Sequence, residues 1–471
     1  MSDTQRPYPP RRRRRRRRRR PNPGPFILVA AMALILIVLC VTAFKGPKDS
    51  AEPSTPTSPT AAPTDAPTDA ATEAPTDGPT EVPTEPPVVK IGSASIATMG
   101  DMLMHMPCVE GAETGDGYDF APYFTNLKPY IESATFAACN LETTLAGLDN
   151  GYKYSGYPAF NCPDAIVDGL KAAGFDMLLT ANNHCYDTRT KGFLRTQEVI
   201  AQAGLLSAGT MSDPEESKYH IVELDGIQVG MVCYTYETDG SPDVVAPNGI
   251  TMSDADEKLI NSFCESELDT FYAEMGQTVA DMEEDGAEAI VLYIHWGVEY
   301  QIQESTTQRK IAQKMCDLGV DVIVGGHPHV IQPMELLTSG EDPEHKTVCL
   351  YSTGNALSNQ RRASMRLDTG HTEDGIVFTF SFGKYSDGTV RVEDVQLLPT
   401  WVNRYTSSET GRRFYDILPL DKTITDWKAA FDLTDSALTD ALESYDRTMD
   451  IVGEGLEEVK AYLQSLPKVE D

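Results

Sequence analysis

Short runs of apolar and β-branched residues recur through the middle of the chain, and each of them ends in a cluster of polar residues. The runs cover residues 88–98, 134–138, 175–180, 289–294 and 320–324. Their length and composition predict β-strands, and helix-like stretches precede several of them. The clusters that follow are Gly100-Asp101, Asn140-Leu141-Glu142, Asn182-Asn183-His184, His295-Trp296-Gly297 and His327-Pro328-His329.

Every cluster therefore falls at the C-terminal end of a predicted strand. In an open α/β sheet, the loops that leave these ends converge on one edge, and ligands bind there. Residues that are far apart in the sequence can meet at such an edge. The pattern predicts a single site built from all five clusters.

The donor atoms of these clusters are typical of a metal site. Asp101 and Glu142 offer carboxylates and His295 offers an imidazole, and this mixture of ligands suits Zn²⁺, Mn²⁺ or Fe. His327 and His329 stand two residues apart after two glycines. In an extended segment both would point to the same side and reach one ion or two adjacent ions.

Each of these residues has a plainer explanation when it is taken alone. A single aspartate after a strand is usually a cap or turn residue, and Asn182-Asn183 could form a turn with positive φ. A single histidine before Trp-Gly is more often packed in a core. The coincidence of five clusters at five strand ends favours a metal-centred active site.

The N-terminal region differs from the rest of the chain. Residues 11–20 are ten consecutive arginines, and residues 26–44 contain no charge. The uncharged run predicts one membrane-spanning helix, with the basic tail (residues 1–25) in the cytoplasm and the later residues outside the cell. The alternative is a cleaved secretory signal, but the run is long and Ala43-Phe44-Lys45 offers no small-x-small cleavage site. The arginines then serve topology and anionic lipid contact rather than nucleic acid.

Residues 45–87 are dominated by proline, threonine, alanine and acids. Such a segment cannot bury enough apolar surface to fold, so we expect a disordered, extended stalk. The net charge of the whole chain is −32, although residues 1–44 hold eleven arginines and a single acid. The remainder is therefore strongly acidic, which excludes nucleic acid as a partner and suits divalent cations as mediators of any contact with an anionic polymer.

The cysteines and the remaining helices add less. None of the nine cysteines forms a C-x-x-C pair, which argues against a zinc ribbon or a thioredoxin-like motif and leaves the redox state open. Acidic helical stretches are expected within residues 251–285, and an amphipathic helix at residues 304–318. Residues 436–466 predict one or two further helices.

Four motifs carry a family resemblance. They are Thr180-Ala-Asn-Asn-His184 with Asp187, His295-Trp-Gly-Val-Glu299, Gly325-Gly-His-Pro-His-Val330 with Gln332-Pro333, and Tyr351-Ser-Thr-Gly-Asn355. From about residue 91 to about residue 398, their order and spacing closely resemble the CapA family of poly-γ-glutamate capsule synthesis proteins. CapA-like domains are in turn similar to calcineurin-like metallophosphoesterases. The resemblance implies an α/β fold, a four-layer α/β/β/α sandwich with a two-metal site at the strand ends.

The resemblance also implies roles for individual residues. Asp101 matches the acid of the first motif, and Glu142 stands where the phosphoesterases place a bridging aspartate. His184 matches the histidine that protonates the leaving group without binding metal. The other implied ligands of two divalent ions (Mn, Fe or Zn) are Asn183, His295, His327 and His329.

One departure from the family pattern bears on the second ion. Phosphoesterases carry Asp-x-His at the first motif, whereas Asp101 is followed by Met102-Leu103 and the nearest histidine is His105. His105 would substitute only if a turn brought it back. Further candidates around the ligands or the substrate are Asn182, Asp187, Glu299 as a carboxylate that orients His295, and Asn355. The pair Arg361-Arg362 is expected to be exposed and solvated.

Two functions follow as expectations. The first is a single-pass membrane protein whose extracellular CapA-like domain (residues 88–400), followed by a helical extension (401–471), is a metal-dependent hydrolase in capsule or envelope polymer biosynthesis. The second is a non-catalytic accessory subunit with a vestigial metal site. The expected partners are the membrane, an anionic polymer such as poly-γ-glutamate, and capsule synthase subunits.

Overall fold

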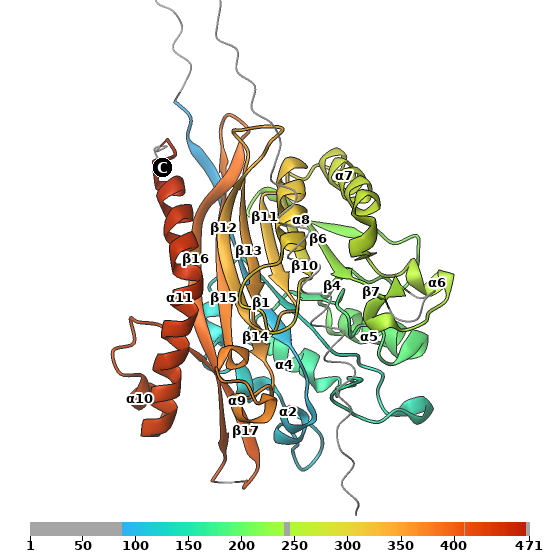
Figure 1. The fold of residues 1–471 in the computed structure, drawn as a ribbon, viewed down its shortest axis with the longest axis vertical. Coiled ribbons are helices and arrows are strands. Elements are labelled where there is room, and N and C mark those ends of the chain that lie inside the picture. Colours follow the sequence, from blue (N-terminus) through green and yellow to red (C-terminus); the bar gives the residue numbers. More distant parts are fainter. Residues whose placement is uncertain (1–86, 240–244, 409, 468–471) are drawn as a thin grey trace, which may run out of the picture. The chain divides into compact units, whose positions relative to one another are not determined.

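The structure is a computed structural model that describes residues 87–239, 245–408 and 410–467. The basic tail, the predicted membrane segment and the stalk up to residue 86 lie outside the described residues. Among the helices that are described, none is long and apolar enough to cross a membrane. Within the described residues, the strands form two large sheets, one of eight strands and one of seven (Figure 1).

The first sheet holds three of the five predicted strands side by side. Its parallel half consists of β1 (Lys90–Met102), β2 (Phe136–Asn140), β3 (Met177–Leu179) and β4 (Leu206–Ala208). Its antiparallel half continues from β1 through β15 (Asp374–Tyr385), β16 (Val390–Thr406) and β17 (Arg413–Pro419), and the short β14 (Asn355–Leu357) pairs in parallel with the end of β1. The carboxyl ends of β1, β2 and β3 therefore lie at one edge.

The second sheet holds the other two predicted strands. Its parallel strands are β6 (Ile227–Tyr236), β10 (Ala289–His295), β11 (Val322–Gly326) and β13 (Lys346–Thr353), with the two-residue β9 (Ser262–Phe263) beside β6. Two antiparallel strands close its edges, β5 (Tyr219–Leu224) and β12 (Ile331–Thr338). A separate small hairpin joins β7 (Thr238–Asp239) and β8 (Val245–Ala246).

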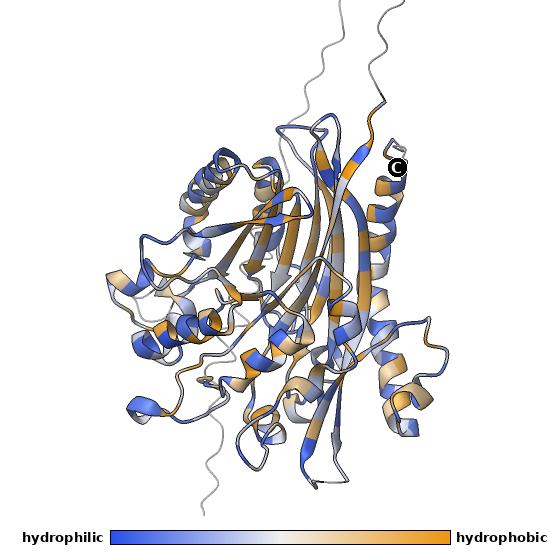
Figure 2. Cartoon of the chain, turned by 180° about the vertical axis from the view of Figure 1, so that it is seen from behind, coloured by the Kyte–Doolittle hydropathy of each residue, from blue (hydrophilic) through white to orange (hydrophobic). Residues whose placement is uncertain are grey.

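The two sheets pack face to face through alternate residues of their strands. Phe378, Phe380 and Phe382 of β15 point into the core between the sheets, together with Val291 and Tyr293 of β10. The residues in between face outward and are covered by helices, which explains why β10 reads as a continuous apolar run. Figure 2 shows apolar and polar residues alternating along the strands.

Helices cover the outer face of each sheet. The first sheet is covered by α2 (Met106–Gly111), α3 (Lys128–Ile131), α4 (Ala165–Ala173) and α5 (Arg189–Ala203). The second is covered by α7 (Leu268–Glu284) and α8 (Thr306–Asp317), the latter started by a capping box between Ser305 and Gln308. Shorter helices are α6 (Asp254–Glu257), α9 (Arg362–Met365) and α10 (Trp427–Ala430).

The C-terminal helix α11 (Asp435–Ser465) runs alongside β16 and β12, one strand from each sheet (Figure 1). Its buried residues Val452, Leu456 and Val459 join the core between the sheets. A bidentate ion pair fixes its position, because Arg447 donates from Nε and Nη2 to the two oxygens of Asp374 at 2.9 and 2.7 Å. The helix is therefore part of the sandwich rather than an appendage to it.

The mixed α/β fold and the five predicted strands are confirmed, and so are the helices predicted near residues 304–318 and 436–466. The predicted helical extension from residue 401 is wrong in its first part. Residues 401–406 continue β16, and Arg413–Pro419 form β17 of the same sheet. All eight cysteines within the described ranges are free thiols, and seven of them are buried.

Asp416 in β17 supplies a prediction about pH and stability. Burial raises the pKa of this carboxyl from 3.8 to about 6, even though the Nδ2 of Asn126 donates to both of its oxygens. A raised folded-state pKa gives stability that is complete below the unfolded pKa and is lost as the pH rises through about 6. Relative to wild type, Asp416→Asn should therefore gain up to about 3 kcal/mol in unfolding free energy between pH 4 and pH 7. Urea titrations of both proteins at pH 4 and pH 7 measure these free energies. The same difference between variant and wild type at the two pH values would contradict the prediction.

Candidate metal centre

The polar ends of β1, β2, β3, β10 and β11 meet at one edge, where the two sheets face each other. Close packing of glycines allows the approach: a Cβ on Gly100 would lie 1.9 Å from the carbonyl oxygen of Gly354, and one on Gly325 would lie 2.0 Å from that of Tyr351. These positions tolerate only glycine without backbone movement. Asp101, near the end of β1, is thereby held against Gly354 between β13 and β14, to whose carbonyl oxygen its backbone N–H donates at 3.1 Å.

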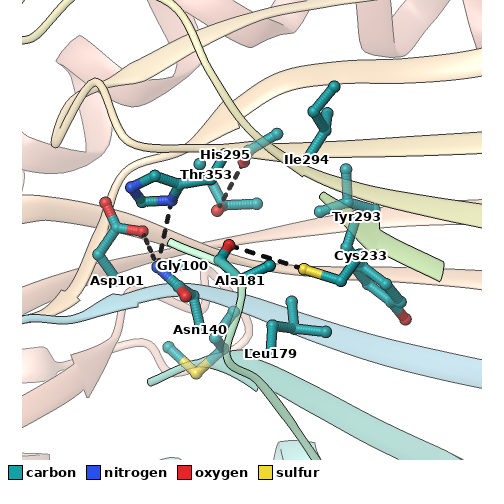
Figure 3. Close-up of a pocket in the computed structure, with 14 residues that line it drawn as sticks. Gly100, Asp101, Asn140, Leu179, Ala181, Cys233, Tyr293, Ile294, His295 and Thr353 are labelled. Atoms are coloured by element: carbon teal, nitrogen blue, oxygen red, sulfur yellow. Dashed lines mark hydrogen bonds between the residues drawn. The ribbon is translucent and has the colours of Figure 1, made fainter. Parts of the chain in front are cut away.

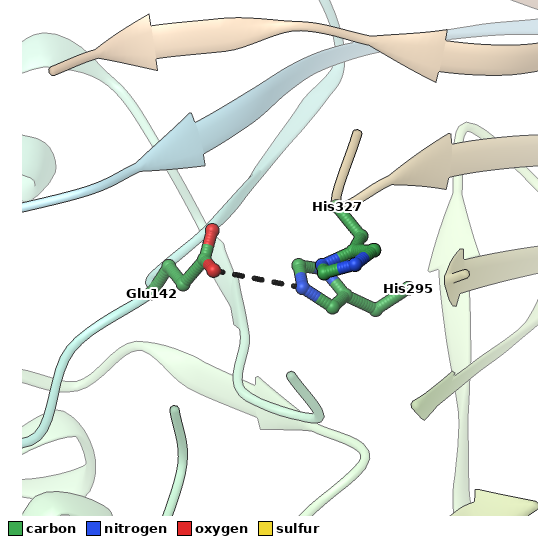
Figure 4. A group of neighbouring side chains, drawn as sticks. All are labelled: Glu142, His295 and His327. Atoms are coloured by element: carbon green, nitrogen blue, oxygen red, sulfur yellow. Dashed lines mark ion pairs between the residues drawn. The ribbon is translucent and has the colours of Figure 1, made fainter. Parts of the chain in front are cut away.

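Two groups of potential metal ligands lie at this edge, and they share one residue. Glu142, His295 and His327 form the first group, and Asp101, Glu142 and His329 form the second. Within each group the ligand atoms lie within 4.8 Å of one another, and all five residues are buried. Figure 4 shows the carboxylate of Glu142 facing the two imidazoles of the first group. Glu142 therefore stands where one carboxylate could bridge two ions.

The bonding of Glu142 fits a cation. The side chain is fully buried, yet neither Oε1 nor Oε2 accepts a hydrogen bond within the described part of the chain. The imidazole nitrogens nearest to Oε1 are His295 Nε2 at 3.6 Å and His329 Nε2 at 3.9 Å. A buried carboxylate without hydrogen bonds is costly unless a positive charge compensates it. Nδ1 of His327 is likewise buried without a partner.

Two of the potential ligands, Asp101 and His327, have the charge states that metal binding needs: an ionised carboxylate and a neutral imidazole. Burial opposes ionisation of Asp101, but its hydrogen bond to His329 holds the pKa of the carboxyl below its usual value. Burial and the neighbouring His295 hold the pKa of His327 well below its usual value, so this imidazole is neutral. Burial also acts to lower the pKa of His329, yet Glu142 and Asp101 raise it to about 9. His329 is therefore protonated, and a cation that binds to this imidazole would displace the proton.

Asn140 links the two groups. Its Nδ2 donates to Asp101 Oδ1 at 2.7 Å and lies 3.5 Å from His295 Nδ1 (Figure 3). Its Oδ1 accepts a hydrogen bond from Asn182 Nδ2 at 3.0 Å. A cavity of about 20 Å³ lies behind these side chains, between the sheets. Asn140 therefore contacts one ligand of each group, and Asn182 holds Asn140 in place.

Asn183 lies beside the first group. Its Oδ1 is 3.0 Å from His295 Nε2, and its Nδ2 donates to Asn248 Oδ1 at 3.0 Å. With Nδ2 engaged, the side-chain carbonyl oxygen faces the imidazole of His295. This orientation gives the first group a fourth potential donor, the side-chain oxygen of Asn183.

His184 is held by a carboxylate on one side of its ring. Its Nδ1 lies 2.8 Å from Asp187 Oδ2, which also accepts the backbone N–H of Phe160 at 2.6 Å. Burial acts to lower the pKa of His184, but Asp187 more than offsets it, and the pKa is raised. Because Nδ1 is engaged, Nε2 is the atom from which a proton can be transferred. A histidine oriented in this way can act as a general acid.

The loops around the site adopt unusual backbone conformations. His327 and His329 have φ values of +94° and +56°, and Arg189, Asn248 and Tyr300 also have positive φ. Non-glycine residues rarely occupy this region, and such strain gathers at functional sites. Neither residue lies in a strand, yet His327 belongs to the first ligand group and His329 to the second.

Two other residues proposed from the sequence, Asn355 and His105, lie outside both ligand groups. Asn355 donates from Nδ2 to the backbone oxygen of His329 at 3.1 Å, so it supports that loop. His105 belongs to neither ligand group in the described residues, and its Nδ1 contacts the backbone of Leu103 and Asn359. The substitution of His105 for the missing motif histidine is therefore not observed.

Two expectations are wrong. Glu299 does not orient His295, whose ring nitrogens face Asn140, Asn183 and Glu142; Glu299 is exposed at the surface instead. Arg361 is not solvated, since its Nη2 lies 2.6 Å from Glu373 Oε2 and its side chain is 11% exposed.

Several residues of the site escaped the sequence reasoning. Tyr236 packs on His327 with ring centroids 4.5 Å apart, and Tyr300 lies near His329. Asn248 contacts both Asn183 and His184. Only the Pro-Asn-Gly turn around Asn248 left a signal in the sequence, and it signalled a turn rather than a site.

Comparison with known proteins agrees with this geometry. The model of the family described as bacterial capsule synthesis protein PGA_cap matches residues 95–360. The chain is 26% identical over 242 residues to the capsule biosynthesis protein CapA of Bacillus anthracis, which covers 50% of this chain and 54% of that protein. It is 26% identical over 268 residues to the PGA biosynthesis protein CapA of Bacillus subtilis (strain 168), with 56% and 63% covered.

The match thus spans less than two thirds of the length of either relative. The match to the family model includes every residue of the two ligand groups, together with His184 and Asp187. Since the family model covers more than half of the sequence, the chain belongs to the bacterial capsule synthesis protein family PGA_cap.

Proposed function

We propose that this protein is a metal-dependent hydrolase that acts on an envelope polymer during capsule biosynthesis. The observation that carries the proposal is the buried carboxylate of Glu142, which lacks hydrogen bonds and is shared by two groups of ligands. The layers of helix, sheet, sheet and helix, with the ligands at the strand ends, support a metallophosphoesterase-type fold. They also support a site for two divalent ions, Mn, Fe or Zn.

Divalent ions bound to these groups would supply Lewis acidity, withdrawing charge from the bond that is attacked. The first ion would be held by Glu142, His295, His327 and Asn183, and the second by Glu142, Asp101 and His329. Asn140 and Asn182 hold these side chains in place. Burial of the ligands excludes bulk water, which strengthens every electrostatic interaction at the site.

His184 supplies the proton in this proposal. Asp187 fixes Nδ1 of the ring, so the protonated Nε2 can donate to the oxygen or nitrogen that departs. The raised pKa keeps His184 protonated to higher pH than an ordinary histidine. The same geometry serves a phosphoester or a peptide-like bond, because both need one proton on the leaving atom.

The family and its relatives indicate the biological setting. The two relatives are named for capsule and PGA biosynthesis, and we propose an anionic polymer of the poly-γ-glutamate kind as the substrate. Bound cations would mediate its contact with so acidic a protein. Residues 26–44 would anchor the protein in the membrane, with the domain outside the cell and near capsule synthase subunits.

A second candidate function is a non-catalytic accessory subunit that grips the polymer. One observation favours it: the second group holds only Asp101, Glu142 and His329, and His105 is not among its members. A weakly held second ion would leave a site that binds carboxylates without cleaving bonds.

The substitution His184→Ala separates the two functions. Loss of a general acid should lower the rate of hydrolysis by about 10²- to 10⁴-fold while the metal content stays unchanged. Hydrolysis of bis(4-nitrophenyl) phosphate and of poly-γ-glutamate by the metal-loaded protein would be measured beside elemental analysis. His220→Ala, which removes a histidine from β5, is the matched control.

If the loaded wild type cleaves neither compound, the hydrolase is abandoned in favour of the accessory function. If His184→Ala and wild type hydrolyse at the same rate, the assignment of the general acid is wrong.

A further inference from the structure

Only one of the two polar atoms at the end of the Asn183 side chain can serve a metal ion. The amide oxygen is an acceptor and can bind a cation, whereas the amide nitrogen carries two hydrogens and cannot. The two ends have nearly the same shape, so the groups around Asn183 decide which of them faces His295. In the structure the oxygen does, because Oδ1 of Asn183 lies 3.0 Å from Nε2 of His295.

Asn248 holds the other end of this amide. Its Oδ1 accepts a hydrogen bond from Nδ2 of Asn183 at 3.0 Å. Within the described residues, the contacts with His295 and Asn248 are the two polar contacts of the Asn183 side chain. Because the amide nitrogen can only donate, an acceptor on this side keeps the nitrogen away from His295 and leaves the oxygen directed toward it.

The competing arrangement reverses both amides together. Nδ2 of Asn183 would then face His295, and its Oδ1 would accept from Nδ2 of Asn248. The first ion would lose an oxygen donor. His184 does not prevent this reversal: Nδ2 of Asn248 lies 3.3 Å from Nδ1 of His184, but this ring nitrogen is already engaged by Asp187 at 2.8 Å. The oxygen of Asn248 is therefore the group that selects the orientation that a metal ligand needs.

The backbone gives an asparagine at position 248 a second, purely local explanation. Pro247–Gly249 form a single 3₁₀ turn, in which Asn248 has φ +52° and ψ +23°. Asparagine enters this left-handed region more readily than most residues with a side chain. Pro247 is buried, whereas Asn248 is exposed and reaches the buried Asn183 from the surface. A test must therefore separate the requirement of the turn from the contact with Asn183.

We propose that Asn248 is a positioning residue for the first metal ion, because its side-chain oxygen keeps the oxygen of Asn183 directed at that ion. Asn248 itself does not touch the ion. The inference rests on the metal centre of the proposed function. Asn183 stands beside the first ligand group, and the second group consists of Asp101, Glu142 and His329. The effect of Asn248 is therefore confined to the first ion.

Calorimetric titration of the full chain with Mn²⁺ tests this role in two backgrounds that each keep one ligand group. Asp101→Asn leaves the first group complete, and His327→Ala leaves the second. In the Asp101→Asn background, Asn248→Ala should weaken Mn²⁺ binding by about tenfold or more, as loss of the partner of a metal ligand does. In the His327→Ala background it should change nothing. Asn248→Asp keeps an acceptor for Asn183 and should bind Mn²⁺ at least as tightly as its parent in the first background.

Asn150 provides the matched control. It is the middle residue of another 3₁₀ turn, Asp149–Gly151, with φ +58° and ψ +21°, and a glycine follows it as well. It is exposed and belongs to neither ligand group. Asn150→Ala places alanine in the same strained conformation. Both alanine variants should therefore lower the thermal stability of the metal-free protein, but Asn150→Ala should leave Mn²⁺ binding unchanged in both backgrounds.

The outcomes separate this inference from the function on which it rests. An unchanged dissociation constant for Asn248→Ala in the Asp101→Asn background would overturn the role of Asn248 and leave the metal centre in place. Equal weakening in both backgrounds, or an Asn248→Asp variant as weak as Asn248→Ala, would overturn it as well. The predicted pattern without any hydrolysis by the wild type would keep the role and overturn the hydrolase. A wild type that binds no divalent ion would overturn both.

Discussion

The substitution Glu142→Gln is expected to abolish binding of both metal ions, whereas changes at the other ligands should each remove one. Glu142 belongs to both ligand groups, and glutamine keeps the shape of the side chain while removing its charge. The affinity for each ion should fall by more than about 100-fold, the upper end of what loss of an outer partner costs. Isothermal titration with Mn²⁺ measures both sites.

Asp101→Asn and His327→Ala are the matched comparisons for Glu142→Gln. Asp101 lies only in the second group and His327 only in the first. Each variant should retain about one equivalent of metal. A Glu142→Gln protein that retains one full-affinity site would show that the carboxylate does not bridge.

The substitution Gly455→Ala in α11 is expected to destabilise the protein, although alanine is normally the better helix residue. A Cβ at this position would lie 1.9 Å from the carbonyl oxygen of Met334 in β12. The helix must then move away from the sheet, and with it the buried Val452 and Leu456. Overpacking of this kind costs about 1–3 kcal/mol of unfolding free energy, which urea denaturation measures.

Gly453, two residues earlier in the same helix, provides the control. The nearest atom to a Cβ there is Cε of Met449 at 3.9 Å. Without a clash, Gly453→Ala should stabilise the protein by about 0.5–1 kcal/mol through the lower entropy of the unfolded chain. If the two variants change stability in the same direction, α11 does not pack against β12 as described.

The ligand edge was predictable because it depends on a regular pattern. Strands β10 and β11 are buried on both faces and read as apolar runs, so the first polar residues after them mark the strand ends. Parallel strands bring these ends together whatever the loops do. Asp101, Glu142 and His295 could therefore be grouped before any coordinates were known.

The contacts around the ligands were not predictable, because they depend on loop geometry. Glu299 stands four residues after His295, yet the positive φ of Gly297 and Tyr300 turns the chain and carries Glu299 to the surface. His105 is the residue that precedes α2, and the start of this helix fixes its ring against the backbone. The spacing of residues along the sequence predicts neither the position of Glu299 nor that of His105.

The strands at one edge of the first sheet, the end of β16 and β17, were not predicted for a different reason. β16 is 17 residues long, and residues 399–403 in its second half are all buried, so this part of the strand does not show an alternating pattern. Its pairing with β17 and its cover by α11 come from residues far away in the sequence. Tertiary contacts decided the structure of residues 401–419, and local pattern did not.

The central claim is that this edge binds two divalent ions. Elemental analysis of the purified full chain, beside the His327→Ala/His329→Ala variant, tests it most directly. We predict about two equivalents of Mn, Fe or Zn in the wild type and almost none in the variant. Absence of metal from the wild type after incubation with each of these ions would contradict the account and leave the buried Glu142 without a compensating charge.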